Sequence, residues 1–217
     1  MIERKIHQIW LGDKKIPNHI KFWMEEIKEK HSNFEYYFWN DNNLPKLPSN
    51  LEKIYQNIPD PPNSPGKADL IRMYLIYEYG GIYIDADFKC VNGFDTFKID
   101  LDSVDGIIAV DDAYGMSALS NSFFAFCKKH ELLKILLDNI KHSSQWLGPN
   151  YWSNILCNYF KYDSSVTFDD FQKDLNHYKI KLLNCTELET EYFKHNPLAS
   201  WVPNSEWNTK LNEGNYD

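Results

Sequence analysis

The chain lacks any long run of apolar residues. No segment approaches the ~20 apolar residues that a membrane-spanning helix needs. The first ten residues carry charges but no apolar stretch of the length that a secretory signal requires. We therefore expect a soluble, cytoplasmic protein whose contact with the inner face of the cell membrane is at most peripheral.

Closely spaced cysteine pairs are also absent. The four cysteines, at positions 90, 127, 157 and 185, include no Cys-x-x-Cys spacing. This scatter argues against a zinc cage or a disulfide framework and is typical of a reducing compartment.

Basic residues are too few to favour nucleic acid as a partner. The chain has 23 Lys and Arg against 31 Asp and Glu, a net charge of −8, and no Lys/Arg cluster. Because an acidic surface repels phosphate backbones, we expect no nucleic-acid binding.

Nothing in the sequence divides the chain into parts. It has no internal repeat, no low-complexity segment and no clear domain boundary over 217 residues, a length that buries a sizeable core. Its hydrophobic fraction of 43% is that of a compact globular protein. We expect one domain over residues 1–217.

Hydrophobic patterning indicates an α/β protein. A strand over 5–11, a helix after Pro17 and a strand over 34–39 form a βαβ beginning, which predicts a parallel sheet. Segment 59–66 has four prolines and is predicted to be a flexible surface loop. Further strands are predicted over 82–84, 106–110, 122–126 and 179–183. Further helices are predicted over 67–79, 131–142 and 151–162.

Two acids, Asp85 and Asp87, directly follow the predicted strand 82–84. In extended backbone, residues i and i+2 project to the same side, so the two carboxylates would share one small volume. They would repel each other unless a cation or a proton lay between them. Hard oxygen ligands suit Mg²⁺ or Mn²⁺, which could hold a diphosphate and neutralise charge on a leaving group. The end of such a strand is also where open α/β sheets bind ligands.

A second triplet of this kind, Asp100-Leu101-Asp102, lies in a polar neighbourhood without a preceding glycine pair, and there we expect a solvated loop. At Asp85 the surroundings differ, because Gly80-Gly81 ends the preceding helix and returns the chain toward it. That return would bring the helical residues Asp69 and Arg72 close to the two acids.

Asp69 and Arg72 are three residues apart and therefore share a helix face. The spacing fits a surface ion pair of little energetic value. It fits equally a donor-binding pair, in which Arg72 meets phosphate or sugar oxygens and Asp69 accepts sugar hydroxyls. Spacing alone leaves both alternatives open.

A family resemblance favours the donor-binding role of Asp69 and Arg72 over the surface ion pair. Residues 68–87 read ADLIRMYLIYEYGGIYIDAD and closely resemble the signature of glycosyltransferase family 32, which includes initiating α-mannosyltransferases of fungi and capsular-polysaccharide glycosyltransferases of bacteria. The same block is similar to that of the clostridial glucosylating toxins. Residues 6–12 and 37–41 resemble the family's first two strands, and the region around Asn121, residues 148–149 and residues 195–201 resemble its C-terminal half.

The resemblance implies a GT-A type nucleotide-diphospho-sugar transferase fold, with a Rossmann-like, mixed, mostly parallel sheet flanked by helices. It implies a retaining, metal-dependent hexosyltransferase that uses a UDP- or GDP-linked sugar and Mn²⁺ or Mg²⁺. The partner would be a glycan or lipid-linked glycan acceptor in capsular or surface polysaccharide synthesis. Because the sequence offers no second carboxylate placed as a nucleophile, we favour front-face attack, in which positioning and electrostatics supply the catalysis.

The family's site residues carry over by position. The catalytic set would be Asp69, Arg72, Asp85 and Asp87, and the metal ligands would be Asp85, Asp87 and His195, whose imidazole favours Mn²⁺ over Mg²⁺. The residues implied to bind the donor are Trp10, Asp69, Arg72, Tyr83, Asp85, Asn121, Ser200 and Trp201.

Simpler roles stay open at several of these positions. Trp10 and Tyr83 could be packing residues, and His195 could be a solvated or core histidine. Ala68 stands where the family often has serine, so one hydroxyl contact would be missing.

Other functions remain as alternatives. An aspartate-nucleophile phosphatase is disfavoured, because Lys89 stands where a Thr or Val is expected and the motif lies far from the first strand. A catalytically silent sugar-nucleotide-binding module and a transferase acting on a protein acceptor stay open.

Overall fold

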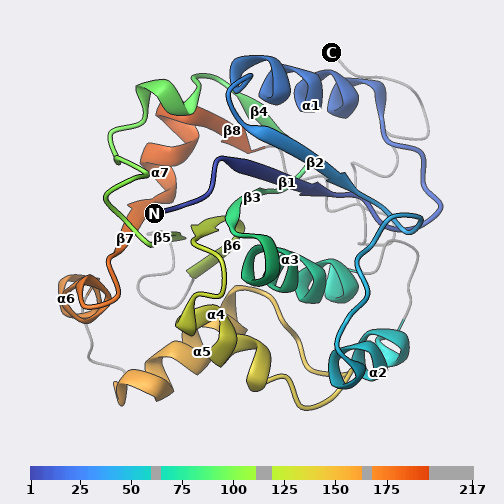
Figure 1. The fold of residues 1–217 in the computed structure, drawn as a ribbon, viewed down its shortest axis with the longest axis vertical. Helices are drawn as coiled ribbons and strands as arrows, with labels where there is room; N and C mark the ends of the chain where they lie inside the picture. The colour runs from blue at the N-terminus through green and yellow to red at the C-terminus, as the bar shows by residue number, and fades with distance from the viewer. Residues whose placement is uncertain (60–64, 111–118, 163–167, 196–217) are drawn as a thin grey trace.

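The computed structural model describes residues 1–59, 65–110, 119–162 and 168–195 (Figure 1). Ser200 and Trp201, two of the predicted donor-binding residues, lie outside this part of the chain, as does most of the predicted loop 59–66. No helix within the described part is long and apolar enough to cross a membrane. All four cysteines are free.

A six-stranded sheet in the order β2-β1-β3-β6-β5-β7 forms the centre of the molecule. Strand β1 pairs in parallel with β2 and β3, and β5 pairs in parallel with β7, while β6 is antiparallel to both of its neighbours. The predicted α/β class and the mixed, mostly parallel sheet are thus confirmed. The strands of this sheet are β1 (Lys5–Ile9), β2 (Glu35–Trp39), β3 (Gly81–Ile84), β5 (Gly106–Val110), β6 (Leu119–Phe126) and β7 (Ile180–Asn184).

A second, two-stranded antiparallel sheet consists of β4 (Phe88–Cys90) and β8 (Phe193–His195). The helices are α1 (Asn18–Lys30), α2 (Ser49–Asn57), α3 (Pro65–Tyr79), α4 (Glu131–Asp138), α5 (Pro149–Phe160), α6 (Phe168–Asn176) and the short α7 (Cys185–Glu187). A 3₁₀ turn, η1 (Phe94–Thr96), and a π-helical turn, η3 (Leu188–Tyr192), complete the described elements.

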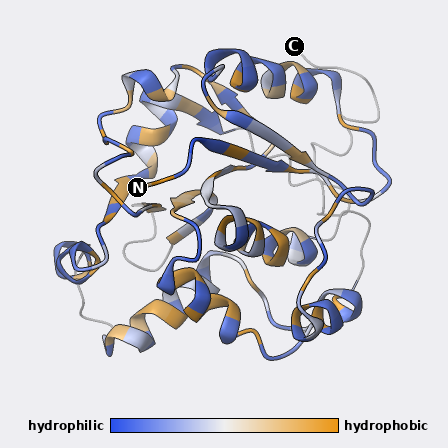
Figure 2. Cartoon of the chain, in the orientation of Figure 1, coloured by the Kyte–Doolittle hydropathy of each residue, from blue (hydrophilic) through white to orange (hydrophobic). Residues whose placement is uncertain are grey.

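Both faces of the large sheet are covered, because alternate strand residues enter two different core clusters. On β3, Tyr83 packs with α3, α4 and α5, whereas Ile82 and Ile84 pack with α1, the β4–β8 sheet and the η3 turn. Figure 1 shows α3, α4 and α5 on one side of the sheet and α1 on the other. Much of α3 is coloured hydrophobic in Figure 2, in keeping with its buried position, whereas α2 is mostly hydrophilic.

Several predicted boundaries were wrong. Helix α3 begins at Pro65, inside the predicted loop, since the first helical turn needs no amide donor and the fixed φ of proline suits it. The helix predicted over 131–142 ends at Asp138. Helices α2 and α6 and the two short strands of the second sheet were not predicted from the sequence.

The glycine pair between α3 and β3 behaves as predicted. Gly80 and Gly81 have φ of +67° and +105°, a left-handed conformation that ends the helix. A Cβ at Gly81 would lie 2.6 Å from the carbonyl oxygen of Lys5, so glycine also permits the close approach of β3 to β1. After these glycines the chain turns back beside α3 as strand β3. Asp85 and Asp87 follow the end of that strand.

His7 on β1 is fully buried beneath this turn. Its Nδ1 accepts a hydrogen bond from Trp39 Nε1 at 3.1 Å, so its Nε2 carries the proton and donates to the Gly80 carbonyl at 3.0 Å. Burial lowers the pKa of His7 to about 4. The folded protein therefore holds this ring neutral in a pH range where the unfolded chain is protonated.

We expect acidification from pH 7 to pH 4.5 to destabilise the protein through His7. His7 binds a proton near pH 6.5 in the unfolded chain but only near pH 4 in the folded chain. The free energy of unfolding therefore decreases as the pH is lowered through that window, by about 2–3 kcal/mol for this residue. Urea unfolding at both pH values measures it. The drop should be smaller in His7→Gln and unchanged in His142→Gln, whose histidine is exposed; an undiminished drop in His7→Gln would contradict the assignment.

Candidate active site

Asp85 and Asp87 lie at the end of β3 on a tight turn. The amide of Phe88 donates to the carbonyl of Asp85 at 3.3 Å and closes the turn over residues 85–88. The expectation of extended backbone through both acids is therefore wrong. The two carboxylates meet because the chain turns, and not because a strand continues.

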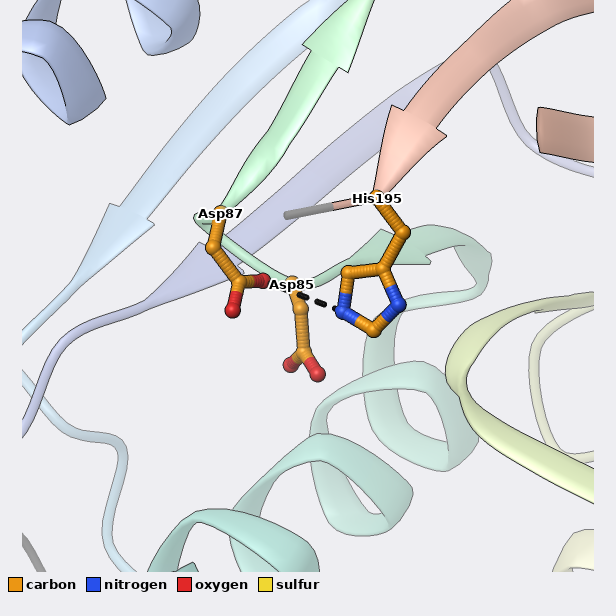
Figure 3. A group of neighbouring side chains, drawn as sticks. All are labelled: Asp85, Asp87 and His195. Atoms are coloured by element: carbon orange, nitrogen blue, oxygen red, sulfur yellow. Dashed lines mark ion pairs between the residues drawn. The ribbon is translucent and has the colours of Figure 1, made fainter. Parts of the chain in front are cut away.

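His195 reaches the same place from the end of β8. Pairing of β8 with β4 sets His195 opposite Phe88, and the two rings stack with centroids 4.3 Å apart and planes 12° from parallel. The imidazole Nε2 lies 3.5 Å from Oδ1 of Asp87 (Figure 3). Asp85, Asp87 and His195 thus each bring one ligand atom within 4.8 Å of the others.

This donor set fits a divalent cation. Two carboxylates and an imidazole are ligands that Mn²⁺ accepts readily, and Mg²⁺ also binds carboxylate oxygens. The side chains of Asp85, Asp87 and His195 are 24%, 17% and 22% exposed, so an ion could reach them from solvent. Burial by itself would lower the pKa of His195, but its hydrogen bond to Asp87 and the nearby carboxylates raise that pKa above the usual value.

Beside this group lies a buried polar network centred on Arg72. Arg72 Nη2 is 3.4 Å from an oxygen of Asp69 and 3.2 Å from one of Asp85. Its Nη1 donates to the carbonyl of Asn121 at 2.8 Å, and the Asn121 amide donates to Asp69 at 2.9 Å. The Asp69 and Arg72 side chains are only 7% and 9% exposed. The alternative of a surface ion pair is therefore wrong for this pair.

Tyr83 on β3 also belongs to this network, through contacts with Asp85 and Arg72. Its hydroxyl donates to Asp85 at 2.5 Å, and the Arg72 guanidinium lies 4.8 Å from the centre of its ring. Tyr83 is 1% exposed, so in this structure it orients Asp85 and packs under Arg72.

Burial raises the pKa of both acids in the network. It raises the pKa of Asp69 to about 6, although Arg72 opposes the shift. The pKa of Asp85 also rises by burial, again against Arg72, and the charge of Asp87 adds to the rise. The Arg72 guanidinium therefore lies beside two carboxyl groups whose burial favours the protonated form.

Trp10 follows β1 at the same edge of the sheet. Its Nε1 donates to the carbonyl of Lys14 at 2.8 Å, and its ring packs on a cluster that contains Ile20, Met24 and Ala86. Ala86 separates the two acids of the turn, so Trp10 belongs to the surroundings of the site. Its stacking on a nucleotide base stays a prediction.

Gln8 also contacts the site, although the sequence did not predict it as a site residue. This residue is fully buried on β1, where its amide donates to the Asp85 carbonyl at 3.2 Å and accepts from Tyr36 Oη at 2.7 Å. The β1–β3 ladder ends at the pair His7–Tyr83, so the Gln8 side chain continues the contact to the turn. A glutamine inside a buried strand was the available signal, since buried polar groups need partners.

The second triplet behaves as expected. Asp102 forms an ion pair at 3.1 Å with Arg4 in which both side chains are about half exposed, and Asp100 caps the amide of Asp102 within the loop. Neither acid belongs to a group that could hold a metal among the described residues.

Residues 17–104 match the family described as "Glycosyltransferase sugar-binding region containing DXD motif". The matched range includes Asp69, Arg72, Asp85 and Asp87. The predicted resemblance to the DXD-containing glycosyltransferases of family 32 is thereby confirmed.

Curated relatives agree with this match. The chain is similar to inositol phosphoceramide mannosyltransferase 3 of Schizosaccharomyces pombe, with 26% identity over 140 residues, which cover 64% of this chain and 37% of that protein. It is also similar to lactosylceramide 4-alpha-galactosyltransferase of Homo sapiens, with 24% identity over 132 residues, which cover 55% of this chain and 35% of that protein. The chain thus spans little more than a third of the length of these two relatives.

Among solved structures, the chain resembles the one titled "PaToxG Glycosyltransferase". The TM-score is 0.59 at 17% identity, and the match covers 82% of this chain and 76% of that one. At this identity the likeness shows the fold, and the predicted GT-A type fold is confirmed.

Proposed function

We propose that this chain is a metal-dependent, retaining glycosyltransferase. It moves a hexose from a UDP- or GDP-linked sugar to a hydroxyl of a glycan or lipid-linked glycan, in capsular or surface polysaccharide synthesis. Residues 1–217 act as one GT-A domain. The observation that carries the proposal is the convergence of Asp85, Asp87 and His195 beside the buried Asp69–Arg72 pair.

The residues have distinct roles in this proposal. Asp87 and His195 are ligands of the cation together with Asp85, which Arg72 and Tyr83 hold in place. When bound, the cation neutralises charge on the donor diphosphate. In this proposal Asp69, which contacts Asn121 and Arg72, accepts hydroxyls of the donor sugar.

The names of two relatives support the proposal of a lipid-linked acceptor. The mannosyltransferase of Schizosaccharomyces pombe is named for inositol phosphoceramide and the galactosyltransferase of Homo sapiens for lactosylceramide, and both are lipid-linked acceptors. A lipid-linked acceptor would bring the enzyme beside a membrane. A product with inverted anomeric configuration, seen by NMR, would exclude the retaining mechanism.

Hydrolysis of a panel of UDP- and GDP-sugars, with and without Mn²⁺, tests the central claim. We expect one preferred donor, loss of turnover in EDTA and recovery when Mn²⁺ is restored, because the cation stabilises the leaving diphosphate. A thermal-shift panel of the same nucleotide sugars measures binding separately.

The two readouts separate the alternatives. Binding without hydrolysis, and without transfer to any glycan acceptor, would favour the silent sugar-nucleotide-binding module. Turnover that is equally fast in EDTA would exclude the metal-dependent mechanism.

A further inference from the structure

Glu189 lies against the side of the His195 ring that faces away from Asp87. The imidazole has one nitrogen on each side, with Nε2 3.5 Å from Asp87 and Nδ1 3.9 Å from Oε1 of Glu189. The ring face is fixed by its stacking on Phe88. His195 is therefore held between two carboxylates, only one of which belongs to the candidate metal group.

The backbone that carries Glu189 is firmly anchored. Glu189 lies on the π-helical turn η3, a rare element that is frequent at functional sites. The turn's first and last residues, Leu188 and Tyr192, are 1% and 2% exposed in the core. The Tyr192 carbonyl also accepts the amide of Val91 at 2.7 Å, which continues the pairing of β8 with the chain after β4.

Two neighbouring glutamates have a different partner. Glu187 and Glu191 both form ion pairs with Lys98, at 3.4 Å and 2.8 Å. The ion pair of Glu189 is with His195. The three acids are alike in chemistry and close in sequence, yet the turn directs one of them toward the candidate site.

A histidine that binds a metal through one nitrogen usually donates its other N–H to a carboxylate or carbonyl, which fixes the tautomer and strengthens the ligand. At 3.9 Å the Glu189 contact is an ion pair and not a direct hydrogen bond. A negative charge at that distance still favours an N–H on the nitrogen that faces it. With the proton on Nδ1, the lone pair of Nε2 points to the side of Asp87.

We infer that Glu189 is a positioning residue for His195: its charge offsets that of Asp87 across the ring, favours a proton on Nδ1 and so makes Nε2 available to the cation. This inference rests on the proposed function, since it concerns the metal site of that function. Glu189 itself stays outside the group of ligand atoms within 4.8 Å of one another.

Titration of the purified protein with Mn²⁺, followed by calorimetry, tests the inference without any turnover. We expect Glu189→Gln to bind Mn²⁺ about 5–10-fold more weakly than the wild type, at or below the lower end of the effect of losing a hydrogen-bonded outer carboxylate, because this contact is a half-exposed ion pair. Glu191→Gln is the matched control, because it removes the same charge two residues away on the same turn, and its affinity should stay within twofold. Thermal unfolding in EDTA should show both variants folded, since both side chains are close to half exposed.

The tautomer of His195 gives a second readout in the metal-free protein. Because Asp87 favours the Nε2–H form and Glu189 favours the Nδ1–H form, nitrogen-15 NMR at pH 8 should show a larger share of Nδ1–H in the wild type and in Glu191→Gln than in Glu189→Gln. If the wild type binds Mn²⁺ and Glu189→Gln matches it in affinity and tautomer, this inference alone is overturned. If the wild type binds no Mn²⁺, the metal-dependent function is overturned, and the inference with it.

Discussion

Asp87→Asn should lower kcat/KM for the preferred donor by about a thousandfold, a loss of roughly 4 kcal/mol in transition-state stabilisation. Asparagine keeps the size and one oxygen of the side chain but removes the negative charge that faces His195 and that would bind the cation in the proposed function. The expected loss is large because Asp87 is one of only three candidate metal ligands that the described part of the chain brings together. Rates measured over a range of Mn²⁺ concentrations would show whether added metal restores part of the activity.

The second Asp-x-Asp triplet offers a matched control for this variant. Asp102→Asn makes the same chemical change in an exposed loop ion pair, and its kcat/KM should stay within twofold of the wild type. If Asp87→Asn also stays within twofold, the cation binds elsewhere or is not needed.

Arg72→Met should destabilise the protein strongly at neutral pH, by about 3–5 kcal/mol, and should abolish turnover. Methionine fills much of the same space but leaves the carboxylates of Asp69 and Asp85 without their buried cation. Loss of one partner of a buried ion pair is costly because the remaining charge stays in a region of low polarity. Urea unfolding measures the loss.

The pH dependence of this loss has a definite sign. Burial already raises the pKa of Asp69 to about 6, and Arg72 opposes that rise, so without Arg72 the pKa increases further. A raised carboxyl pKa means that the folded state binds the proton more tightly than the unfolded state, and stability is then lost as pH rises. We expect the gap between Arg72→Met and the wild type to be smaller at pH 5 than at pH 7.5.

Arg4→Met controls for the loss of an arginine in general. Arg4 pairs with Asp102 at the surface, where both side chains are about half exposed, so the change should cost less than about 1 kcal/mol at either pH. An Arg72→Met variant with the same deficit at pH 5 and pH 7.5 would contradict the buried-carboxylate explanation.

Elements with a strong local pattern were predicted well. Strand β5 was predicted with its observed bounds, and β1, β2, β3 and β7 to within two residues, because short apolar or alternating runs ended by turn residues have few other structures open to them. Strand β6 was predicted three residues short at its beginning. The strands β4 and β8 have three residues each, and such short segments become strands only when they find each other.

The sequence predicted which acids belong to the site but not the backbone conformation that brings their carboxylates together. The sequence placed Asp85 and Asp87 at the end of a strand, and the glycine pair correctly predicted the return toward Asp69 and Arg72. The turn over residues 85–88 was missed, because its hydrogen bond depends on how β4 leaves the large sheet to pair with β8.

The sequence by itself therefore determined the α/β class, the family resemblance and the local set of Asp69, Arg72, Asp85 and Asp87, all of which lie within 19 consecutive residues. These features depend on periodicity, turn chemistry and spacing along one stretch of chain. Only the tertiary structure decided that the pair Asp69–Arg72 is buried, since burial depends on what covers a helix face. It also set His195 beside Asp87, because pairing of β4 with β8 joins segments that are distant in sequence and that no local pattern connects.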